Sequence, residues 1–414
     1  MKPSRLYPIL TLILFFSLPL FSQVRISGNL QSALYTWENS AENQLYDFYQ
    51  YAQFRWQPSQ NPDFYLGTYF RFARIGQERL SGNQIYAQDE DVYSWDDRLY
   101  NLYLHWKTTN KRLMLRLGRQ FVYQGVINGT LDGLLASVKA TDDLTVKIFA
   151  GLEAPENREF KLRDTDDGTA FGGYASYRLP WQNKFEVSYF QKMRKVSQGN
   201  TTETETVWQL LGFALNGQTK NLYYQAYYDQ NLKSKELQGM RYRLTYYWRQ
   251  WSIMGEYNSQ RPRLYEDSFF RVFNIKAYNQ IRAGATYDIN RYQVGLQYIF
   301  TDVHYSESNQ FLLSLGNPWG HIGLVLQTGD AGENVGAYGQ IRYPVMAQLT
   351  VKAYAAYYNY ERQTTVVSED AIGLSAGLEY RPIELVSLEG EIQQSNNSLF
   401  KNDTRGLFRL NVFF

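Results

Sequence analysis

The sequence predicts an all-β fold, a transmembrane antiparallel up-and-down β-barrel of about 22 strands, with about 18 as the lowest acceptable number. Three observations predict it. Apolar and polar residues alternate along segments of about 10 residues, the length with which a tilted strand crosses a bilayer. The connections between these segments are alternately short and long. Most of the tryptophans lie beside the short connections.

The alternation is clear in Met240–Arg249, where apolar residues alternate with Arg241, Arg243 and Thr245, and it recurs in Ile372–Arg381. Helical spacing fits neither segment. A soluble β-sandwich would also alternate, but ordinary strands have about five or six residues. A sandwich also has no reason to gather its tryptophans at one end.

The connections give the number of strands. Ten short turns alternate with eleven longer connections, which gives about 22 strands with both chain ends on the side of the short turns, the periplasm in an outer-membrane barrel. The short turns are Gln57–Asp63, Thr108–Lys111, Thr141–Asp143, Pro180–Asn183, Gly217–Thr219, Arg249–Gln250, Ile289–Asn290, Gly316–Pro318, Pro344–Ala347 and Arg381–Glu384. The longer connections include Gly76–Asp97, Arg119–Asp132, Leu152–Gly168, Ser259–Ala277 and Ser395–Thr404.

Tryptophan and proline give two independent checks. Tryptophan favours the membrane–water interface, where its ring is buried and its N–H is hydrated. Six tryptophans beside short turns form a predicted interface girdle: Trp56, Trp106, Trp181, Trp248, Trp251 and Trp319. Proline cannot donate a hydrogen bond within a sheet, and six prolines fall in the predicted short turns: Pro58, Pro62, Pro180, Pro318, Pro344 and Pro382.

The N-terminus predicts secretion. Lys2 and Arg5 precede the apolar run Ile9–Phe21, a pattern typical of a signal peptide. The alternative is a short membrane anchor, but the 13-residue run is below the ~17–25 residues of a spanning helix. Pro19 would also break such a helix. We therefore expect residues 1–22 to be a signal peptide.

Cleavage after Ser22 or after Gln23 is equally compatible with the sequence, and we expect residues 23–414 to form a single barrel domain. The first predicted strand, Val24–Trp37, follows at once and leaves no room for an N-terminal plug domain. A barrel of about 22 strands is normally plugged. We therefore expect its lumen to be open, narrowed by inward-folding loops, or filled by a separate protein.

Composition excludes other classes of protein. The 414 residues include no cysteine, which rules out thiol catalysis and disulfides, and the formal net charge of +2 gives no basis for binding nucleic acid. Only three histidines are present, His105, His304 and His321, and none forms a convincing pair with a serine. No cofactor or metal motif is found, so we expect no enzymatic activity, cofactor or metal.

Charged residues opposite the apolar stripes should line the pore. The predicted pore-lining residues are Arg55, Arg71, Arg116, Arg241, Arg243, Arg282, Glu256 and Asp288. Rings of Arg and Lys select anions, and Arg241, Arg243 and Arg282 are the best candidates for an anion-attracting ladder. The alternative, which we favour because lumens are polar whatever they carry, is that these are solvated residues paired with Glu256 and Asp288.

Two further features have two interpretations each. Inward tyrosines could stack on sugar rings or simply fill the wall: Tyr49, Tyr51, Tyr65, Tyr69, Tyr223 and Tyr227. The loop Ser259–Ala277 contains the apolar residues Phe269, Phe270, Val272 and Phe273. It either folds into the mouth as a constriction or extends a hairpin above the membrane.

Two stretches resemble known families. Leu115–Gly133 (LRLGRQFVYQGVINGTLDG) resembles the GRQ…G…DG pattern of bacterial outer-membrane porins, including alginate-export-like and other anion or carboxylate porin families, through Gly118, Arg119, Gln120, Gly125, Asp132 and Gly133. The C-terminal residues resemble the signal for outer-membrane barrel assembly, through Phe408, Leu410, Val412 and Phe414. The resemblance implies diffusion or export of a hydrophilic solute, and an anionic solute is compatible with it.

Taken together, these features predict a porin-like channel of the bacterial outer membrane for passive passage of small hydrophilic solutes. Its expected partners are outer-membrane lipid and lipopolysaccharide, the barrel-assembly machinery and the solutes, with no nucleic acid. The alternative function is a large barrel that acts as a sheath or scaffold around a periplasmic or surface protein, which would be a partner in the lumen. An outer-membrane hydrolase ranks third.

Overall fold

The computed structural model describes residues 24–38, 44–76, 93–166, 168–198, 201–262, 278–303, 306–330, 332–362, 365–397 and 402–414. The predicted signal peptide, residues 1–22, lies outside the described residues. In the part of the chain that the structure describes, no helix is long and apolar enough to cross a membrane. The strands are β1 (Val24–Glu38), β2 (Gln44–Pro58), β3 (Phe64–Gly76), β4 (Tyr93–Lys107), β5 (Leu113–Gln124), β6 (Ile127–Lys139), β7 (Leu144–Glu153), β8 (Thr169–Leu179), β9 (Asn183–Gln198), β10 (Thr201–Thr219), β11 (Leu222–Asn231), β12 (Glu236–Trp248), β13 (Trp251–Gln260), β14 (Tyr278–Ile289), β15 (Tyr292–Val303), β16 (Glu307–Asn317), β17 (Gly320–Gly329), β18 (Asn334–Met346), β19 (Leu349–Arg362), β20 (Thr365–Ile383), β21 (Val386–Asn396) and β22 (Asp403–Phe413).

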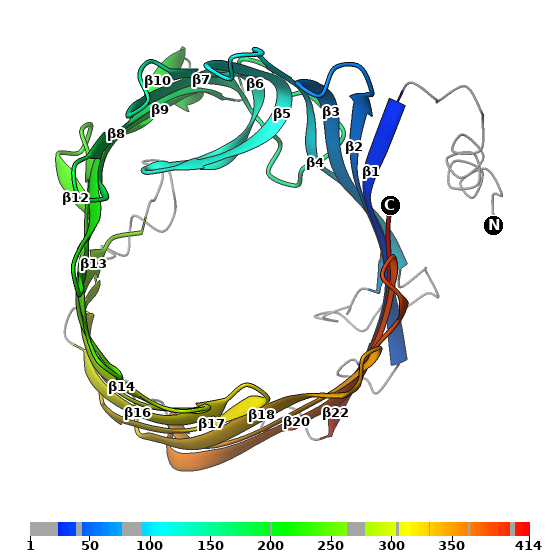
Figure 1. Cartoon of the computed structure of the whole chain (residues 1–414), viewed down its shortest axis with the longest axis vertical. Coiled ribbons are helices and arrows are strands. Elements are labelled where there is room, and N and C mark those ends of the chain that lie inside the picture. The colour runs from blue at the N-terminus through cyan, green and yellow to red at the C-terminus, as the bar shows by residue number, and fades with distance from the viewer. Residues whose placement is uncertain are drawn as a thin grey trace.

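The 22 strands form one closed barrel (Figure 1). Each strand pairs antiparallel with its neighbours along the chain, and β22 pairs with β1 from Asn29–Phe413 onwards. At the end of this seam Gly28 and Phe414 exchange both backbone hydrogen bonds, of 2.8 and 3.1 Å. Closure is required because lipid offers no hydrogen-bond partners to an unpaired strand edge. The predicted fold class and strand number are confirmed.

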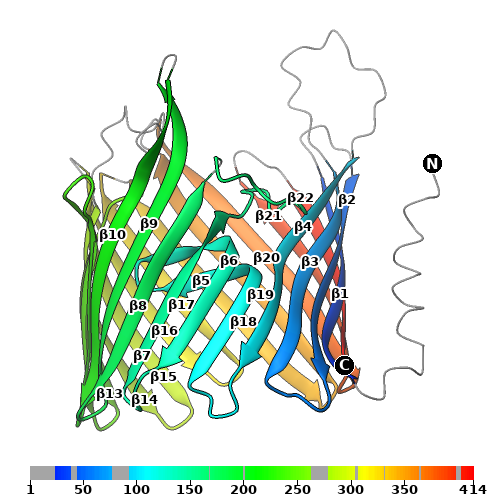
Figure 2. The ribbon, with the colours of Figure 1, turned by 90° about the horizontal axis from the view of Figure 1, so that it is seen from above.

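The short turns lie at one edge of the barrel, the edge where β1 begins and the chain ends (Figure 2). All ten predicted short connections are found there, with boundaries shifted by a few residues. Turn residues in them adopt φ values of 50° to 59°, at Lys111, Trp181, Lys220, Arg249 and Asn290. Tight hairpin turns need this left-handed backbone to match the twist of the strands they join.

Three of the proline predictions differ from the structure. Pro58 is the last residue of β2, next to its predicted turn, and two others lie further inside strands. Pro344 and Pro382 lie within β18 and β20, not in turns. Each stands where the pairing register shifts, between Pro344 and Met346 and between Tyr380 and Ile383. Because proline has no N–H to donate, a strand tolerates it where the ladder is already interrupted.

The outer face of the barrel is apolar. Ile253, Leu296, Leu313 and Leu324 lie in one row across β13, β15, β16 and β17, joined in register through Ala285 of β14. These four side chains are 47% to 57% exposed. A contiguous apolar band of this kind is unfavourable in water and is the expected surface of a barrel embedded in lipid.

The seam can be tested by deleting Phe414. We expect the deletion to weaken closure, because it removes both backbone hydrogen bonds to Gly28 and the ring contact with Phe54, whose centroid lies 5.7 Å away. The measurement is the fraction of refolded protein that migrates as the compact, heat-modifiable form in electrophoresis. Phe414→Tyr keeps the ring and the backbone groups and should fold like the wild type. Equal folding of the deletion and the wild type would contradict the role of the seam.

A candidate pore constriction and its lumen

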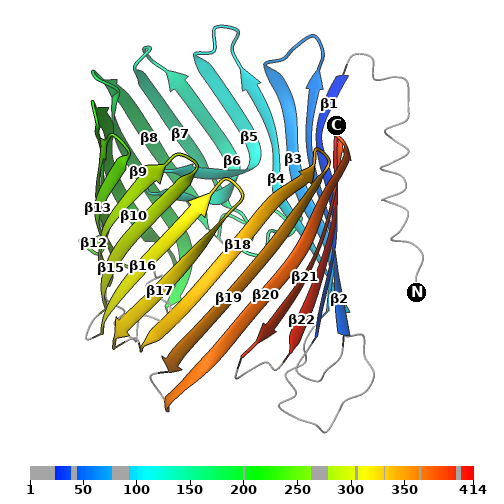
Figure 3. The same ribbon diagram turned by 60° about the horizontal axis from the view of Figure 1, so that its bottom comes forward.

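Strands β5 and β6 leave the barrel wall and fold into its interior as a hairpin (Figure 1 and Figure 3). β5 pairs with β4 no further than Arg119, and β6 pairs with β7 only from Leu131 onwards. Residues 121–130 therefore have strand partners only within the hairpin. The prediction of a long loop over Arg119–Asp132 is wrong, because β5 and β6 both continue through this stretch and are joined by a tight turn at Gly125 and Val126.

Glycines allow the hairpin to bend. Gly118, Gly133 and Gly151 lie opposite one another on β5, β6 and β7, at the point where the hairpin leaves the wall. Gly118 has a φ of 123°, and a Cβ atom there would lie 2.3 Å from the carbonyl oxygen of Leu102. A Cβ atom on Gly133 would lie 2.2 Å from the carbonyl oxygen of Ala150. No other residue fits this bend without strain.

One face of the hairpin is buried against the inner wall. The apolar cluster that holds it there consists of Val122, Val126, Ile127, Leu131, Leu135, Phe149, Ala170, Tyr174, Phe190 and Leu210, contributed by β5 to β10 and the hairpin turn. At the tip, the backbone N–H of Val126 donates to Ser188 Oγ at 3.0 Å. Burial of each large apolar side chain contributes about 1.5–3 kcal/mol. The hairpin therefore packs against the inner face of the wall from β5 to β10.

A buried ion pair fixes the base of the hairpin. Arg119 donates from Nε and one terminal nitrogen to the two carboxylate oxygens of Asp132, both at 2.7 Å. The two side chains are only 3% and 6% exposed. The guanidinium also donates to the carbonyl oxygens of Glu159 and Lys161, at 2.6 and 2.7 Å. Two-point pairing with further hydrogen bonds is the geometry that makes a buried ion pair tolerable.

The connection between β7 and β8 closes the gap that the hairpin leaves in the wall. The N–H of Leu99 on β4 donates to the carbonyl oxygen of Arg158 at 2.6 Å. Phe160 stacks on Phe72, a residue of the apolar outer stripe, with 6.1 Å between centroids and 4° between planes. Phe160 and Leu162 are exposed. The connection thus supplies a backbone hydrogen bond to the edge of β4 that β5 leaves, and exposed apolar side chains beside it.

The other face of the hairpin carries exposed aromatic rings. Phe121 and Tyr123 are 49% and 70% exposed. Their rings lie 6.3 Å apart and are nearly parallel, at 7°. Because the hairpin lies inside the ring of strands (Figure 1), these rings face the lumen and not the lipid.

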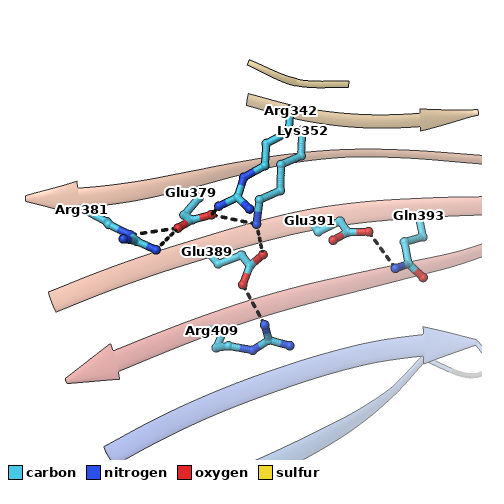
Figure 4. A network of polar contacts seen from close by, with 8 residues as sticks. All are labelled: Arg342, Lys352, Glu379, Arg381, Glu389, Glu391, Gln393 and Arg409. Atoms are coloured by element: carbon cyan, nitrogen blue, oxygen red, sulfur yellow. Dashed lines mark hydrogen bonds and ion pairs between the residues drawn. The ribbon is translucent and has the colours of Figure 1, made fainter. Parts of the chain in front are cut away.

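On the far side of the lumen, charges are paired. Carboxylates of β20 and β21 bind cations from the strands on either side, in a network of Arg342, Lys352, Glu379, Arg381, Glu389 and Arg409 (Figure 4). Glu379 alone contacts three cations at 2.7 to 3.0 Å. Each of the four cations in this network contacts a carboxylate, although the two carboxylates do not balance all four positive charges.

The proposed arginine ladder is also largely paired. Arg243 and Arg282 flank Glu256, whose side chain is 9% exposed, at 4.0 and 3.8 Å. Arg241 lies exposed on the same face of β12. Asp288 accepts a hydrogen bond of 2.8 Å from a glutamine of β15. Glu256 therefore lies within ion-pair distance of two of the predicted arginines. Asp288 instead binds the side chain of a glutamine.

Three cations differ from these. Arg55 on β2, Arg116 on β5 and Lys147 on β7 have no carboxylate partner among the residues that the structure describes. Each lies over a tyrosine ring, that of Tyr65 at 4.1 Å, of Tyr103 at 5.1 Å and of Tyr174 at 5.6 Å respectively. Cation–π contacts of this kind hold a cation in place without neutralising it.

One predicted pore-lining cation does not present its charge to the lumen. Arg71 is buried and forms an ion pair with Asp96. Arg116, by contrast, remains accessible and donates from Nε to His105 Nδ1 at 3.2 Å. His105 in turn stacks on Tyr65, with 4.3 Å between ring centroids. The histidine thus positions the cationic group.

Four of the predicted girdle tryptophans lie at strand ends on the side of the short turns, and Trp181 and Trp319 lie in the turns themselves. All six are exposed: Trp56, Trp106, Trp181, Trp248, Trp251 and Trp319. The predicted assembly signal lies at the end of the chain, in β22 and the residue after it: Phe408, Leu410, Val412 and Phe414. Their roles as girdle and signal stay predictions.

The sequence identifies the constriction only in part. The loop Ser259–Ala277 is one candidate, but residues 263–277 lie outside the described residues. The hairpin is missed as a constriction, although its pattern is present in Leu115–Gly133. Glycines at the base and apolar residues around the turn are the signal that could have found it.

No protein-family model matches the chain, and no curated protein matches it either. Among solved structures, the P pilus usher (PapC) translocation pore has a TM-score of 0.55 at 10% identity, over 94% of this chain and 99% of that chain. A mutant of the ferric enterobactin receptor (PfeA) from Pseudomonas aeruginosa has a TM-score of 0.60 at 8% identity, over 94% of this chain and 80% of that chain. A BenF-like porin from Pseudomonas fluorescens Pf-5 has 0.45 at 10% identity, over 95% and 99%. The first two likenesses show the fold, that of a large outer-membrane-type β-barrel.

The ion pair at the base of the hairpin can be tested with Arg119→Ala. This change leaves Asp132 buried without its partner, which costs about 3–5 kcal/mol. We expect the hairpin to come away from the wall and the single-channel conductance in planar bilayers to rise and become noisy. The double variant Arg119→Met with Asp132→Leu replaces the pair by apolar groups and should restore a quiet, lower conductance. Conductance of the single variant equal to that of the wild type would contradict the role of the pair.

Proposed function

We propose that the protein is a porin-like channel of the bacterial outer membrane, through which small hydrophilic solutes pass passively, with a preference for anions. The observation that carries the proposal is a closed barrel whose outer face is apolar and whose lumen is polar, charged and narrowed by its own hairpin. A polar, water-filled interior is what a barrel channel offers a hydrophilic solute.

The outer-membrane location is supported by several features together. The exposed apolar band suits contact with lipid, and the tryptophans at the side of the short turns suit the interface. The predicted signal peptide suits export. Contact with lipopolysaccharide and with the barrel-assembly machinery belongs to the same proposal.

The anion preference is supported by Arg55, Arg116 and Lys147. Most other lumen cations described above contact a carboxylate, with Arg241 of β12 as an exception, whereas these three have none among the described residues and lie together on the wall from β2 to β7. Charged groups along a narrow passage select ions of opposite sign.

We propose a channel without enzymatic activity, because it is the simplest account of the lumen side chains described above. His105 is held between Arg116 and Tyr65, a setting that suits positioning more than proton transfer. A barrel that serves as a sheath for a protein partner is an outcome of the test below.

Ion selectivity in planar bilayers tests the proposal. Under a gradient of potassium chloride, we expect the wild type to conduct with a reversal potential that reports anion preference. The triple variant Arg55→Gln, Arg116→Gln and Lys147→Gln should move the reversal potential toward zero, because it removes the unpaired positive charge.

Arg243→Gln is the matched control, since that arginine is paired with Glu256, and it should change the reversal potential much less. Absence of conductance from the folded wild type would overturn the channel and favour the sheath. Conductance with the same selectivity in the triple variant would overturn the assignment of these three residues.

A further inference from the structure

We propose that the inner wall of β1 to β4 carries a binding track for neutral carbohydrate chains. The inference rests on the proposed channel and names a class of solute for it. It is carried by four tyrosine rings in a row, by the amide side chains on both sides of them, and by the internal partners of the charged groups nearby.

The rings follow one another across three strands. Tyr49 and Tyr51 lie on β2, Tyr69 on β3 and Tyr100 on β4. Successive ring centroids are 6.2, 6.4 and 4.6 Å apart, with 19°, 26° and 21° between the planes. Four partly buried, nearly parallel rings thus follow one another in a row, with Arg158 over the last ring at 4.8 Å.

The row lies on the lumen side of the wall. Tyr49 and Tyr51 alternate along β2 with Phe48 and with other residues of the apolar outer stripe. On β4 the alternation is broken, because Tyr69 pairs with Asn101 and the next residue of β3 pairs with Leu99. Tyr100 is therefore the extra residue of a bulge and stacks on Tyr69. Bulges re-aim side chains in this way, often next to functional sites.

Amide side chains border the rings on the same face. Asn29 pairs with Gln53 and Gln31 pairs with Tyr51 across β1 and β2, and Asn101 pairs with Tyr69 across β3 and β4. An amide both donates and accepts hydrogen bonds, as the hydroxyl groups of a sugar do. Aromatic faces match the C–H faces of a pyranose ring, and the neighbouring amides match its hydroxylated edge.

The charged groups Asp47 and Arg71 within the track bind partners in the protein itself. Asp47 accepts hydrogen bonds from the backbone N–H of Gly76 at 2.6 Å, from Trp37 at 3.2 Å and from the Tyr49 hydroxyl at 3.3 Å. Arg71 is bound to Asp96, as described above. Asp47 keeps its negative charge, which disfavours an acidic sugar over an uncharged one. Of the three cations without a carboxylate partner among the described residues, Arg55 lies on the same face of β2, two residues beyond Gln53, whereas Arg116 and Lys147 lie on β5 and β7.

A row of similar sites also suits transport. A solute that passes through a channel must bind strongly enough to enter it. Its binding must also be weak, or divided over several sites, so that the solute can leave. Four adjacent rings let a sugar chain move from one ring to the next, with one stacking contact formed as another is lost.

Block of the ion current by maltohexaose, a neutral linear glucan, tests the track. In planar bilayers we expect the wild type to show interruptions of current whose frequency rises with maltohexaose concentration. The double variant Tyr51→Leu and Tyr69→Leu should weaken the block by about tenfold, because two central rings are lost. Tyr51→Phe with Tyr69→Phe keeps the rings and should block like the wild type. Tyr223→Leu, on the far wall, is the matched control and should leave the block unchanged.

The outcomes separate this inference from the proposed channel. A wild type that conducts ions but is not blocked by maltohexaose overturns the track and leaves the channel in place, whereas a wild type that conducts nothing overturns the channel itself. Equal block in the wild type and the double leucine variant also overturns the track. Stronger block by hexagalacturonate than by maltohexaose overturns the assignment to neutral carbohydrate.

Discussion

The whole structure depends on the pairing of backbone hydrogen-bonding groups in an environment without water. A sheet in lipid must close on itself, and the pairing of β1 with β22 closes this one. The same requirement explains the connection between β7 and β8. Where β5 turns away from β4, the exposed edge of β4 is met by the backbone of Arg158. When parts of two strands fold into the interior of a barrel, another segment must pair with the backbone groups that they leave in the wall.

The hairpin is stable inside a hydrated lumen because it brings a small core of its own. Its buried face is apolar, its base is held by Arg119 and Asp132, and its tip is bonded to Ser188. The wall under it is adapted as well, since Phe149 and Phe190 occupy inward positions that carry polar groups elsewhere in the barrel. Constriction and wall are therefore parts of one packed unit on β5 to β10.

Sequence periodicity was sufficient for the barrel, because each strand repeats the same two-residue alternation and each tight turn has its own residue chemistry. It was not sufficient for the hairpin. The residues of Arg119–Asp132 alternate like a strand yet contain two glycines, and only the contact with β9 and β10, distant in the sequence, decides where they go. The pairing of Glu256 with two arginines follows from strand register, which alternation alone leaves open. Pro344 and Pro382 show the same limit, since register irregularities absorb residues that would otherwise end a strand.

The position of the hairpin has a geometric consequence for anything that crosses the barrel. Among the described residues it covers only the arc from β5 to β10, so the cross-section that these residues leave open is eccentric and borders β11 to β22 and β1 to β4. The path of the proposed solute therefore runs beside one side of the wall and not along the central axis. The hairpin and the opposite wall differ in chemistry, so the two sides of this path are unlike each other, as are its two ends.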